Sequence, residues 1–194
     1  MDILISGVGG QGTILTSKIL AESAVINGSK AARTGETIGM SQRGGCVVSH
    51  VRTENTYSPY IPMGSADLLL SFELCEGARN IPQIKKDAPA IINTAQVNPI
   101  IVALGQADYN TEEMKNYISA HSKAYFINAN DIAIKCGSVK AVNVVLVGAA
   151  YGLGLLNMSK ESIIKAIEKL VKPKFLEMNM KAFESGITAA EALK

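Results

Sequence analysis

The amino-acid sequence predicts an α/β fold with a mainly parallel sheet, and three observations support this prediction. Short apolar runs alternate with segments of helical periodicity, as expected for strands joined by crossover helices. The first run, residues 1–6, leads directly into a cluster of glycines. Residues 46–53 alternate in polarity and follow a loop, which indicates an antiparallel strand. We therefore expect a three-layer, Rossmann-like α/β fold with a mainly parallel sheet plus an antiparallel strand or small second sheet.

The glycine cluster has the spacing G-x-G-x-x-G and lies between the expected first strand and a helix that starts near Thr13. Glycines at this spacing permit a tight turn, a close approach of backbone to phosphate, and close packing of helix on strand. The helix would direct its free N–H groups towards an anion. The alternative is that the glycines only permit the turn. The candidate ligand-binding residues are Gly7, Gly9, Gly10, Gln11, Gly12 and Thr13.

A short second strand is expected over residues 29–34. In a dinucleotide-binding unit, an acidic residue near the end of this strand holds the ribose hydroxyls. Here Lys30 and Arg33 occupy that place, and Glu36 lies slightly beyond it. This pattern argues against NAD and favours a nucleotide with an additional ribose phosphate, so Arg33 joins the candidate site.

Residues 34–45 combine glycines and hydroxyl side chains without apolar periodicity, which predicts a long exposed loop. Loops of this length are often functional. Arg43 next to two glycines suits an anion or a carboxylate of a partner protein. The alternative is an ordinary surface arginine. The candidate residues of this loop are Ser41, Gln42, Arg43, Gly44 and Gly45.

The remaining elements follow from periodicity and capping residues. Further strands are expected over residues 46–53, 66–72, 89–94 and 124–128. Helices are expected after Glu73, after Asn110, over 131–136, over the apolar glycine-rich stretch 139–156, after Ser159 and from Pro173. Glu73 and Glu76 are interpreted as solvated acids at a helix start, the alternative being that they face a ligand. His50 is interpreted as a structural histidine within a strand. Residues 1–194 are expected to form a single domain, with the helices of about 157–194 packed on it.

Composition excludes several classes of function. A formal net charge of +2 favours neither nucleic acid nor a membrane surface. No signal peptide or membrane-spanning run is recognised, so a cytoplasmic protein is expected. Three widely spaced cysteines indicate reduced thiols and cannot hold a four-cysteine iron–sulfur cluster. With only two histidines, a metal site is not expected either. No catalytic constellation is evident, which suits a subunit better than a self-sufficient enzyme.

Several motifs together resemble the gamma-type domain of 2-oxoacid:ferredoxin oxidoreductases. They are Gly7–Thr13, Gly39–Gly45, Val47–Arg52, Ser58–Pro62, Ala66–Leu70, Pro173–Leu176 and Lys181–Glu184. The Met-Ser-Gln-Arg-Gly-Gly form of the second motif looks closest to the small (beta) subunit of indolepyruvate ferredoxin oxidoreductase. The family pattern has a histidine where this chain has Ile38. The substrate therefore stays open between indolepyruvate, another aryl pyruvate and a different 2-oxoacid.

The resemblance implies a coenzyme A-dependent oxidative decarboxylation that reduces ferredoxin. It implies that a large (alpha) partner subunit carries thiamine diphosphate, Mg and the iron–sulfur clusters, and that this chain contacts coenzyme A. Ferredoxin would be met through the complex. Two alternatives remain: a stand-alone NAD(P)-linked Rossmann reductase, and a non-enzymatic nucleotide-binding interaction module.

Overall fold

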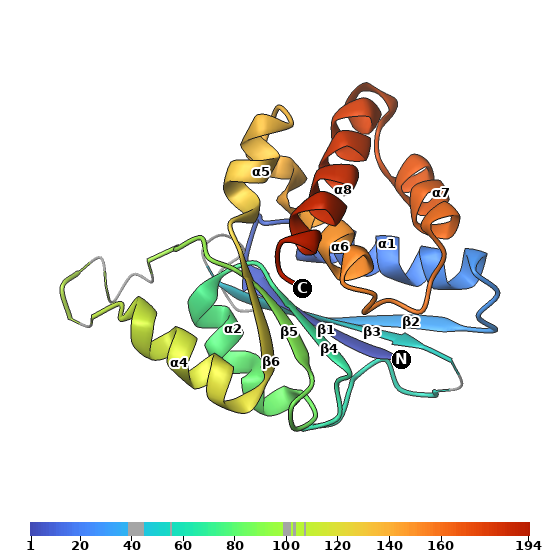
Figure 1. Cartoon of the computed structure of the whole chain (residues 1–194). Coiled ribbons are helices and arrows are strands. Elements are labelled where there is room, and N and C mark those ends of the chain that lie inside the picture. Colours follow the sequence, from blue (N-terminus) through green and yellow to red (C-terminus); the bar gives the residue numbers. More distant parts are fainter. Residues whose placement is uncertain (39–44, 55, 99–101, 103, 107) are drawn as a thin grey trace.

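The computed structural model describes residues 1–38, 45–54, 56–98, 102, 104–106 and 108–194 (Figure 1). One six-stranded sheet has the order β2-β3-β1-β4-β5-β6. Its strands are β1 (Asp2–Val8), β2 (Ala32–Ile38), β3 (Cys46–Thr53), β4 (Leu68–Ser71), β5 (Pro89–Asn93) and β6 (Lys123–Ile127). The pairs β1–β4, β4–β5 and β5–β6 are parallel, whereas β3 is antiparallel to both β1 and β2. The predicted fold class is confirmed, with β3 as the reversed strand within a single sheet.

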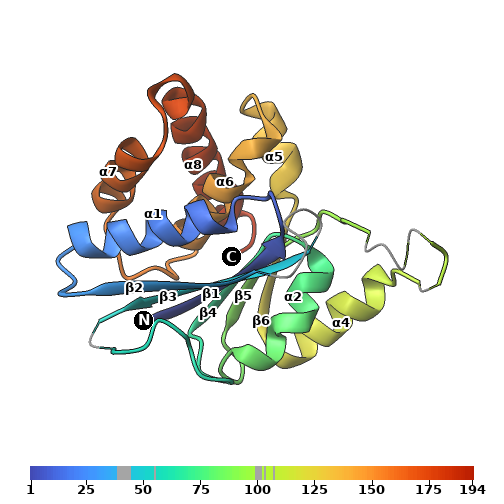
Figure 2. The same cartoon turned by 180° about the vertical axis from the view of Figure 1, so that it is seen from behind.

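Helices cover both faces of the sheet (Figures 1 and 2). On one side lie α1 (Thr13–Ile26), α5 (Ala129–Lys135), α6 (Val142–Gly152), α7 (Lys160–Leu170) and α8 (Leu176–Glu191). On the other side lie α2 (Leu74–Asn80) and α4 (Thr111–His121). The 3-10 turns are η1 (Ile81–Gln83), η2 (Val139–Ala141) and η3 (Pro173–Phe175). Within the part of the chain that the structure describes, none of the helices has the length and apolar character needed to cross a membrane.

Helix α6 forms the centre of the core on the α1 side. Its residues from Val142 to Ala150 are all buried, as expected for a helix that is apolar all round. Two glycines allow α8 to lie directly against it. A Cβ atom added at Gly148 would be 2.2 Å from the Phe183 carbonyl oxygen, and one added at Gly186 would be 2.2 Å from the Val145 carbonyl oxygen. The close approach of these two helices therefore depends on both glycines.

The second strand lies later in the chain than predicted. It covers Ala32–Ile38 in place of residues 29–34, so the first part of the expected loop 34–45 is strand instead. The sequence pattern is misleading because β2 is an edge strand, and edge strands carry polar residues that resemble a loop. A glycine is favoured at position 35 of this strand because Pro59 and Tyr60 cover it. Each has an atom 3.2 Å from where a Cβ would stand.

Local capping explains where most helices begin. The predicted caps are confirmed for two helices: Asn110 Oδ1 accepts from the Glu113 N–H at 3.1 Å, and Ser159 Oγ accepts from the Ser162 N–H at 3.2 Å. Such caps satisfy N–H groups that have no partner within the helix. These short-range interactions made the boundaries of α4 and α7 predictable.

His50 is buried in β3 beneath the segment that follows this strand. Its Nδ1 accepts from the Ile61 N–H at 3.3 Å, and its ring meets Tyr60 edge-on at 5.4 Å between centroids. Burial lowers the pKa of His50 below its usual 6.5; the positive charge of Arg52 contributes to this shift and Glu36 opposes it. The ring is thus held in the neutral form that can accept the Ile61 hydrogen bond.

We expect this histidine to make folding stability pH-dependent. The unfolded chain binds a proton at His50 more readily than the folded chain. The contribution of His50 to stability is therefore full above the pKa of the unfolded chain, and it is lost as the pH falls below that pKa. Urea unfolding of the wild type and of His50→Gln, measured from pH about 7.5 to about 5.5, tests this. The glutamine oxygen can still accept the hydrogen bond, and the amide does not titrate in this interval, so the variant should lose less stability than the wild type as the pH falls. If the stability of the two proteins changed equally with pH, the neutral buried state assigned to His50 would be wrong.

Candidate functional site

The glycine turn, residues 7–12, connects the end of β1 to the start of α1. Its conformation is held by the side chain of Gln11. The amide oxygen of Gln11 accepts from the Val8 N–H at 2.7 Å, and its Nε2 donates to the Phe72 carbonyl at 3.3 Å. The Gln11 N–H also donates to the Val8 carbonyl at 3.1 Å. Gln11 therefore shapes the turn and ties it to the end of β4.

Three glycines of the turn are favoured by their local surroundings or backbone conformation. A Cβ at Gly7 would lie 2.8 Å from Gln11 Oε1 and 2.9 Å from Phe72 Cβ. Gly10 and Gly12 have φ angles of +98° and +94°, which favour glycine. Gly10 is exposed, and its Cβ position has nothing within 4 Å. The turn thus presents open backbone to solvent at Gly10 while Gly7 is packed below it.

The first turn of α1 is suited to an anion. The helix has no side-chain cap, and its first turn contains no acidic residue. Helix N-termini carry a partial positive charge, which is normally compensated by a capping oxygen or an acid. Thr13, the first helical residue, is buried, 4% exposed. The uncapped end of α1 and the open Gly10 backbone are the features that indicate a phosphate-binding turn.

From the second predicted motif, the structure places Gly45 beside this turn. The Gly45 carbonyl accepts from the Gly9 N–H at 2.9 Å, which joins the start of β3 to the glycine turn. Ser41, Gln42, Arg43 and Gly44 lie outside the described residues. The link through Gly9 nevertheless places the end of that loop beside the candidate phosphate site.

Arg33 does not lie near the glycine turn. It is aligned with Arg52, which in turn is aligned with Asp2 at the beginning of β1, and its Nε donates to the Thr56 carbonyl at 2.5 Å. The prediction that Lys30 and Arg33 bind a ribose phosphate beside this turn is wrong because the strand is shifted: Arg33 is the second residue of β2, and Lys30 precedes the strand. The carboxyl end of β2 is Ile38, which pairs through Val47 with Gly7.

A buried polar cluster beneath the turn was missed by the sequence prediction. Glu73, interpreted as a solvated acid, is only 1% exposed. Its carboxylate accepts from the Glu76 N–H at 2.9 Å, the Val97 N–H at 3.3 Å and the Tyr109 hydroxyl. The only signal in the sequence is an acid three residues before Glu76 at a helix start, a pattern typical of capping.

Glu76 and Cys46 extend this cluster towards the glycine turn. Cys46 is the ladder partner of Val8, the last residue of β1. Glu76 is 6% exposed, and its Oε1 lies 3.3 Å from Arg79 Nη1. Burial, together with the neighbouring Glu76, raises the pKa of the Cys46 thiol to about 12. The pKa of Cys75 is also raised, chiefly by burial. Both thiols are therefore protonated at neutral pH and poorly suited to act as nucleophiles.

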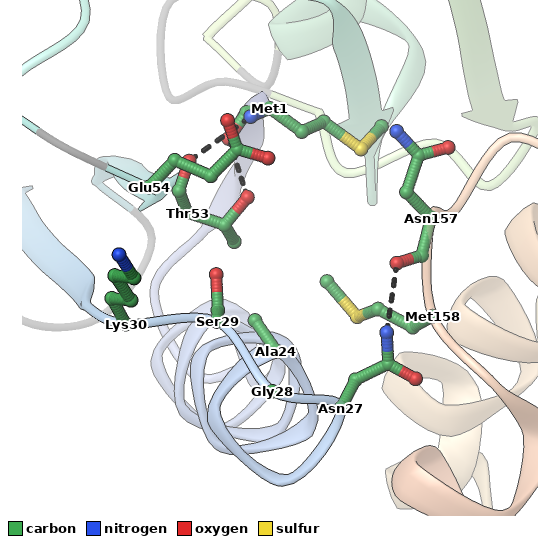
Figure 3. A pocket seen from close by; sticks show the side chains of 10 residues that line it. All are labelled: Met1, Ala24, Asn27, Gly28, Ser29, Lys30, Thr53, Glu54, Asn157 and Met158. Atoms are coloured by element: carbon green, nitrogen blue, oxygen red, sulfur yellow. Dashed lines mark hydrogen bonds between the residues drawn. The ribbon is translucent and has the colours of Figure 1, made fainter.

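A separate cavity of about 380 Å³ lies at the opposite end of β1 (Figure 3). Its walls include Met1, Lys30 and Glu54. Asn27 Nδ2 donates to the Asn157 carbonyl at 3.3 Å across one side of it. The length of β1 separates this cavity from the glycine turn, so it is not part of the candidate phosphate site.

Among the described residues, no group of three His, Cys, Asp or Glu side chains is arranged to hold a metal ion.

Comparison with known proteins agrees with this fold. Residues 2–189 match the family model described as pyruvate ferredoxin/flavodoxin oxidoreductase. The chain is 38% identical to indolepyruvate oxidoreductase subunit IorB of Thermococcus kodakarensis over 196 aligned positions, which cover 99% of this chain and 96% of that protein. It is 37% identical to the subunit of the same name from Pyrococcus horikoshii, with the same coverage.

A solved structure shares the architecture. It is the gamma subunit of a keto/oxoacid ferredoxin oxidoreductase from Geobacter sulfurreducens, with a TM-score of 0.72 and 26% identity over 98% of both chains. The sequence and structural matches both extend over nearly the whole chain. The chain therefore belongs to the pyruvate ferredoxin/flavodoxin oxidoreductase family.

Proposed function

We propose that this chain is a non-autonomous subunit of a 2-oxoacid:ferredoxin oxidoreductase whose substrate is indolepyruvate or another aryl pyruvate. The observation that carries the proposal is the 38% identity to an indolepyruvate oxidoreductase subunit across 99% of the chain. The reaction is the oxidative decarboxylation of the 2-oxoacid. Carbon dioxide is released, the acyl group is transferred to the thiol of coenzyme A, and the electrons pass to ferredoxin.

The ligand that we assign to the glycine turn is coenzyme A, with its pyrophosphate at Gly9, Gly10, Gly12 and Thr13. The turn fits this anion because α1 has neither a side-chain cap nor an acid in its first turn. Gln11 holds the turn in shape through Val8 and Phe72. When bound, coenzyme A supplies the thiol that accepts the acyl group. On sequence grounds we also assign Ser41–Gly45 to contact with a ligand phosphate or with the partner subunit.

Other cofactors are assigned to a large (alpha) partner subunit, which would carry thiamine diphosphate, Mg and the iron–sulfur clusters. An iron–sulfur cluster does not fit the cysteines of this chain. Cys46 and Cys75 lie beside Glu76, whereas Cys136 follows α5 within the core on the α1 side. Ferredoxin would be met through the complex, which we place in the cytoplasm.

The test uses the full chain co-expressed with its large subunit and an assay of aryl-pyruvate-dependent ferredoxin reduction. Gly10→Asp and Gly10→Asn form a matched pair, because they share shape and backbone strain and differ in charge. The carboxylate would repel a pyrophosphate from the open turn. We expect Gly10→Asp to raise the KM for coenzyme A by ~10-fold or more over Gly10→Asn, which corresponds to ~1.4 kcal/mol.

Two outcomes would contradict the proposal in different ways. If the two chains never associate or give no 2-oxoacid-dependent activity, the subunit assignment is wrong. If the complex is active but both Gly10 variants have the same KM for coenzyme A, the enzyme assignment stands and the phosphate site lies elsewhere. The KM for the 2-oxoacid serves as the internal control and should not differ between the variants.

A further inference from the structure

A second cavity, of about 540 Å³, lies among the helices on the α1 side of the sheet. Its walls come from α1, η2, the end of α7, η3 and the start of α8. Figure 2 shows α1, α7 and α8 together on one side of the sheet. The apolar part includes Leu15, Leu170, Phe175 and Met178. The volume is in the range of ligand sites, ~300–1,000 Å³, which are typically lined by apolar side chains with a few polar groups.

The apolar walls are accessible to solvent. Phe175 is 44% exposed although it is aromatic, and Met178 is partly buried beside it. Methionine adapts its shape to irregular partners, which suits a site that accepts a small molecule. Leu15 stands two residues after Thr13, so a molecule in this cavity would touch the first turn of α1.

The side chains that line the cavity carry positive charge only. Its two ionisable lining residues, Lys140 and Lys172, stand on different walls, one in η2 and one between α7 and η3. Neither lysine takes part in an ion pair within the part of the chain that the structure describes. Lys174 lies over the Phe175 ring, with Nζ 4.9 Å from the centroid, and adds positive charge at the rim. Lysines around a concave apolar surface create a positive potential that attracts anions.

We propose that this cavity binds a small amphipathic anion: an apolar, ring-sized or short-chain body that carries one carboxylate or comparable anionic group. The body occupies the space between Leu15, Leu170 and Met178, and the anionic group is held by Lys140 and Lys172. This site is distinct from the glycine turn.

The probe is 1-naphthaleneacetate, titrated into the full chain and followed by its fluorescence. The chain contains no tryptophan, so the naphthalene signal is well separated from the protein. The double variant Lys140→Glu/Lys172→Glu should weaken binding by ~10-fold or more. The neutral analogue 1-naphthaleneethanol should bind wild type and variant equally. The control Lys86→Glu/Lys165→Glu changes the same number of charges at exposed positions outside the cavity and should bind like wild type.

A second readout locates the probe. The naphthalene ring current should shift the methyl NMR signal of Met178, identified by its loss in Met178→Leu, more than those of the other methionines. The proposal is overturned if the wild type shows no saturable binding, if both double variants weaken binding equally, or if the shifted methyl signal belongs to a methionine away from this cavity.

Discussion

Gly148→Ala is expected to reduce the free energy of unfolding by about 3 kcal/mol, the upper part of the usual range for overpacked cores. The added methyl group would stand 2.2 Å from the Phe183 carbonyl oxygen and 3.0 Å from the Phe183 carbonyl carbon. These atoms belong to the backbone of α8, so no side-chain rotation can relieve the clash. The two helices must move apart, which opens the core on the α1 side. Urea unfolding followed by far-ultraviolet circular dichroism measures the loss.

Gly154→Ala is the matched control. It makes the same chemical change just beyond the end of α6, where φ is +72° and nothing lies within 4 Å of the added atom. Only backbone strain acts there, which costs about 1 kcal/mol. If Gly148→Ala lowers the free energy of unfolding no more than Gly154→Ala does, the inference that α6 and α8 pack with their backbones in contact is wrong.

The contact between these helices also bears on the glycine turn. Asn143, in the first turn of α6, is 2% exposed, and its Cβ lies 3.4 Å from where a Gly12 Cβ would stand. A shift of α6 would therefore change the packing of Asn143 against the turn. In the assembled enzyme, Gly148→Ala should raise the KM for coenzyme A, whereas Gly154→Ala should not.

Glu73→Ala is the second change with a large expected effect, a loss of about 3 kcal/mol. The substitution removes the N-terminal cap of α2 and leaves the Val97 N–H and the Tyr109 hydroxyl without their acceptor. The pKa of Tyr109 is raised, first by burial and then by the Glu73 carboxylate, so the phenol remains a hydrogen-bond donor at all ordinary pH values. Glu73→Gln should lose less, because the amide oxygen can still accept one of these bonds.

An exposed acid provides the comparison. Glu112 lies in the first turn of α4 with a side chain that is 76% exposed and pairs with Lys115. Glu112→Ala should change stability by about 0.5 kcal/mol or less, as surface ion pairs usually do. Thermal and urea unfolding of the three variants gives the ranking. A Glu73→Ala protein as stable as Glu112→Ala would show that the buried cluster contributes little.

The predicted elements that proved correct depend on short-range interactions. The glycine turn, the caps at Asn110 and Ser159 and the apolar helix α6 are each specified within a few residues, by backbone conformation, by hydrogen bonds or by unbroken hydrophobicity. The predicted strands other than the second correspond to β1, β3, β4, β5 and β6, because their apolar content is continuous or alternates. Sequence periodicity is informative where a strand is buried on at least one face.

The errors arose where distant segments decide the environment. The residues of β2 are polar because the strand stands at the edge of the sheet, and its register is set by β3 through pairs such as Gly35 with His50. Glu73 resembles a surface acid until Tyr109 and Val97, more than twenty residues away, cover it. Neither pairing leaves a periodic signal in the local sequence.

The sequence by itself determined the fold class, the glycine turn between the first strand and helix, and the lack of cluster-binding cysteines, since each depends on local residue types and spacing. Only the tertiary structure decided which basic and acidic residues belong near that turn. Arg33 lies at the far end of β1 from the turn, whereas the Gly45 carbonyl accepts a hydrogen bond from the Gly9 N–H. Glu73 and Glu76 are buried. Strand register and the burial of charge are set by contacts between distant segments, and these are formed only when the chain folds.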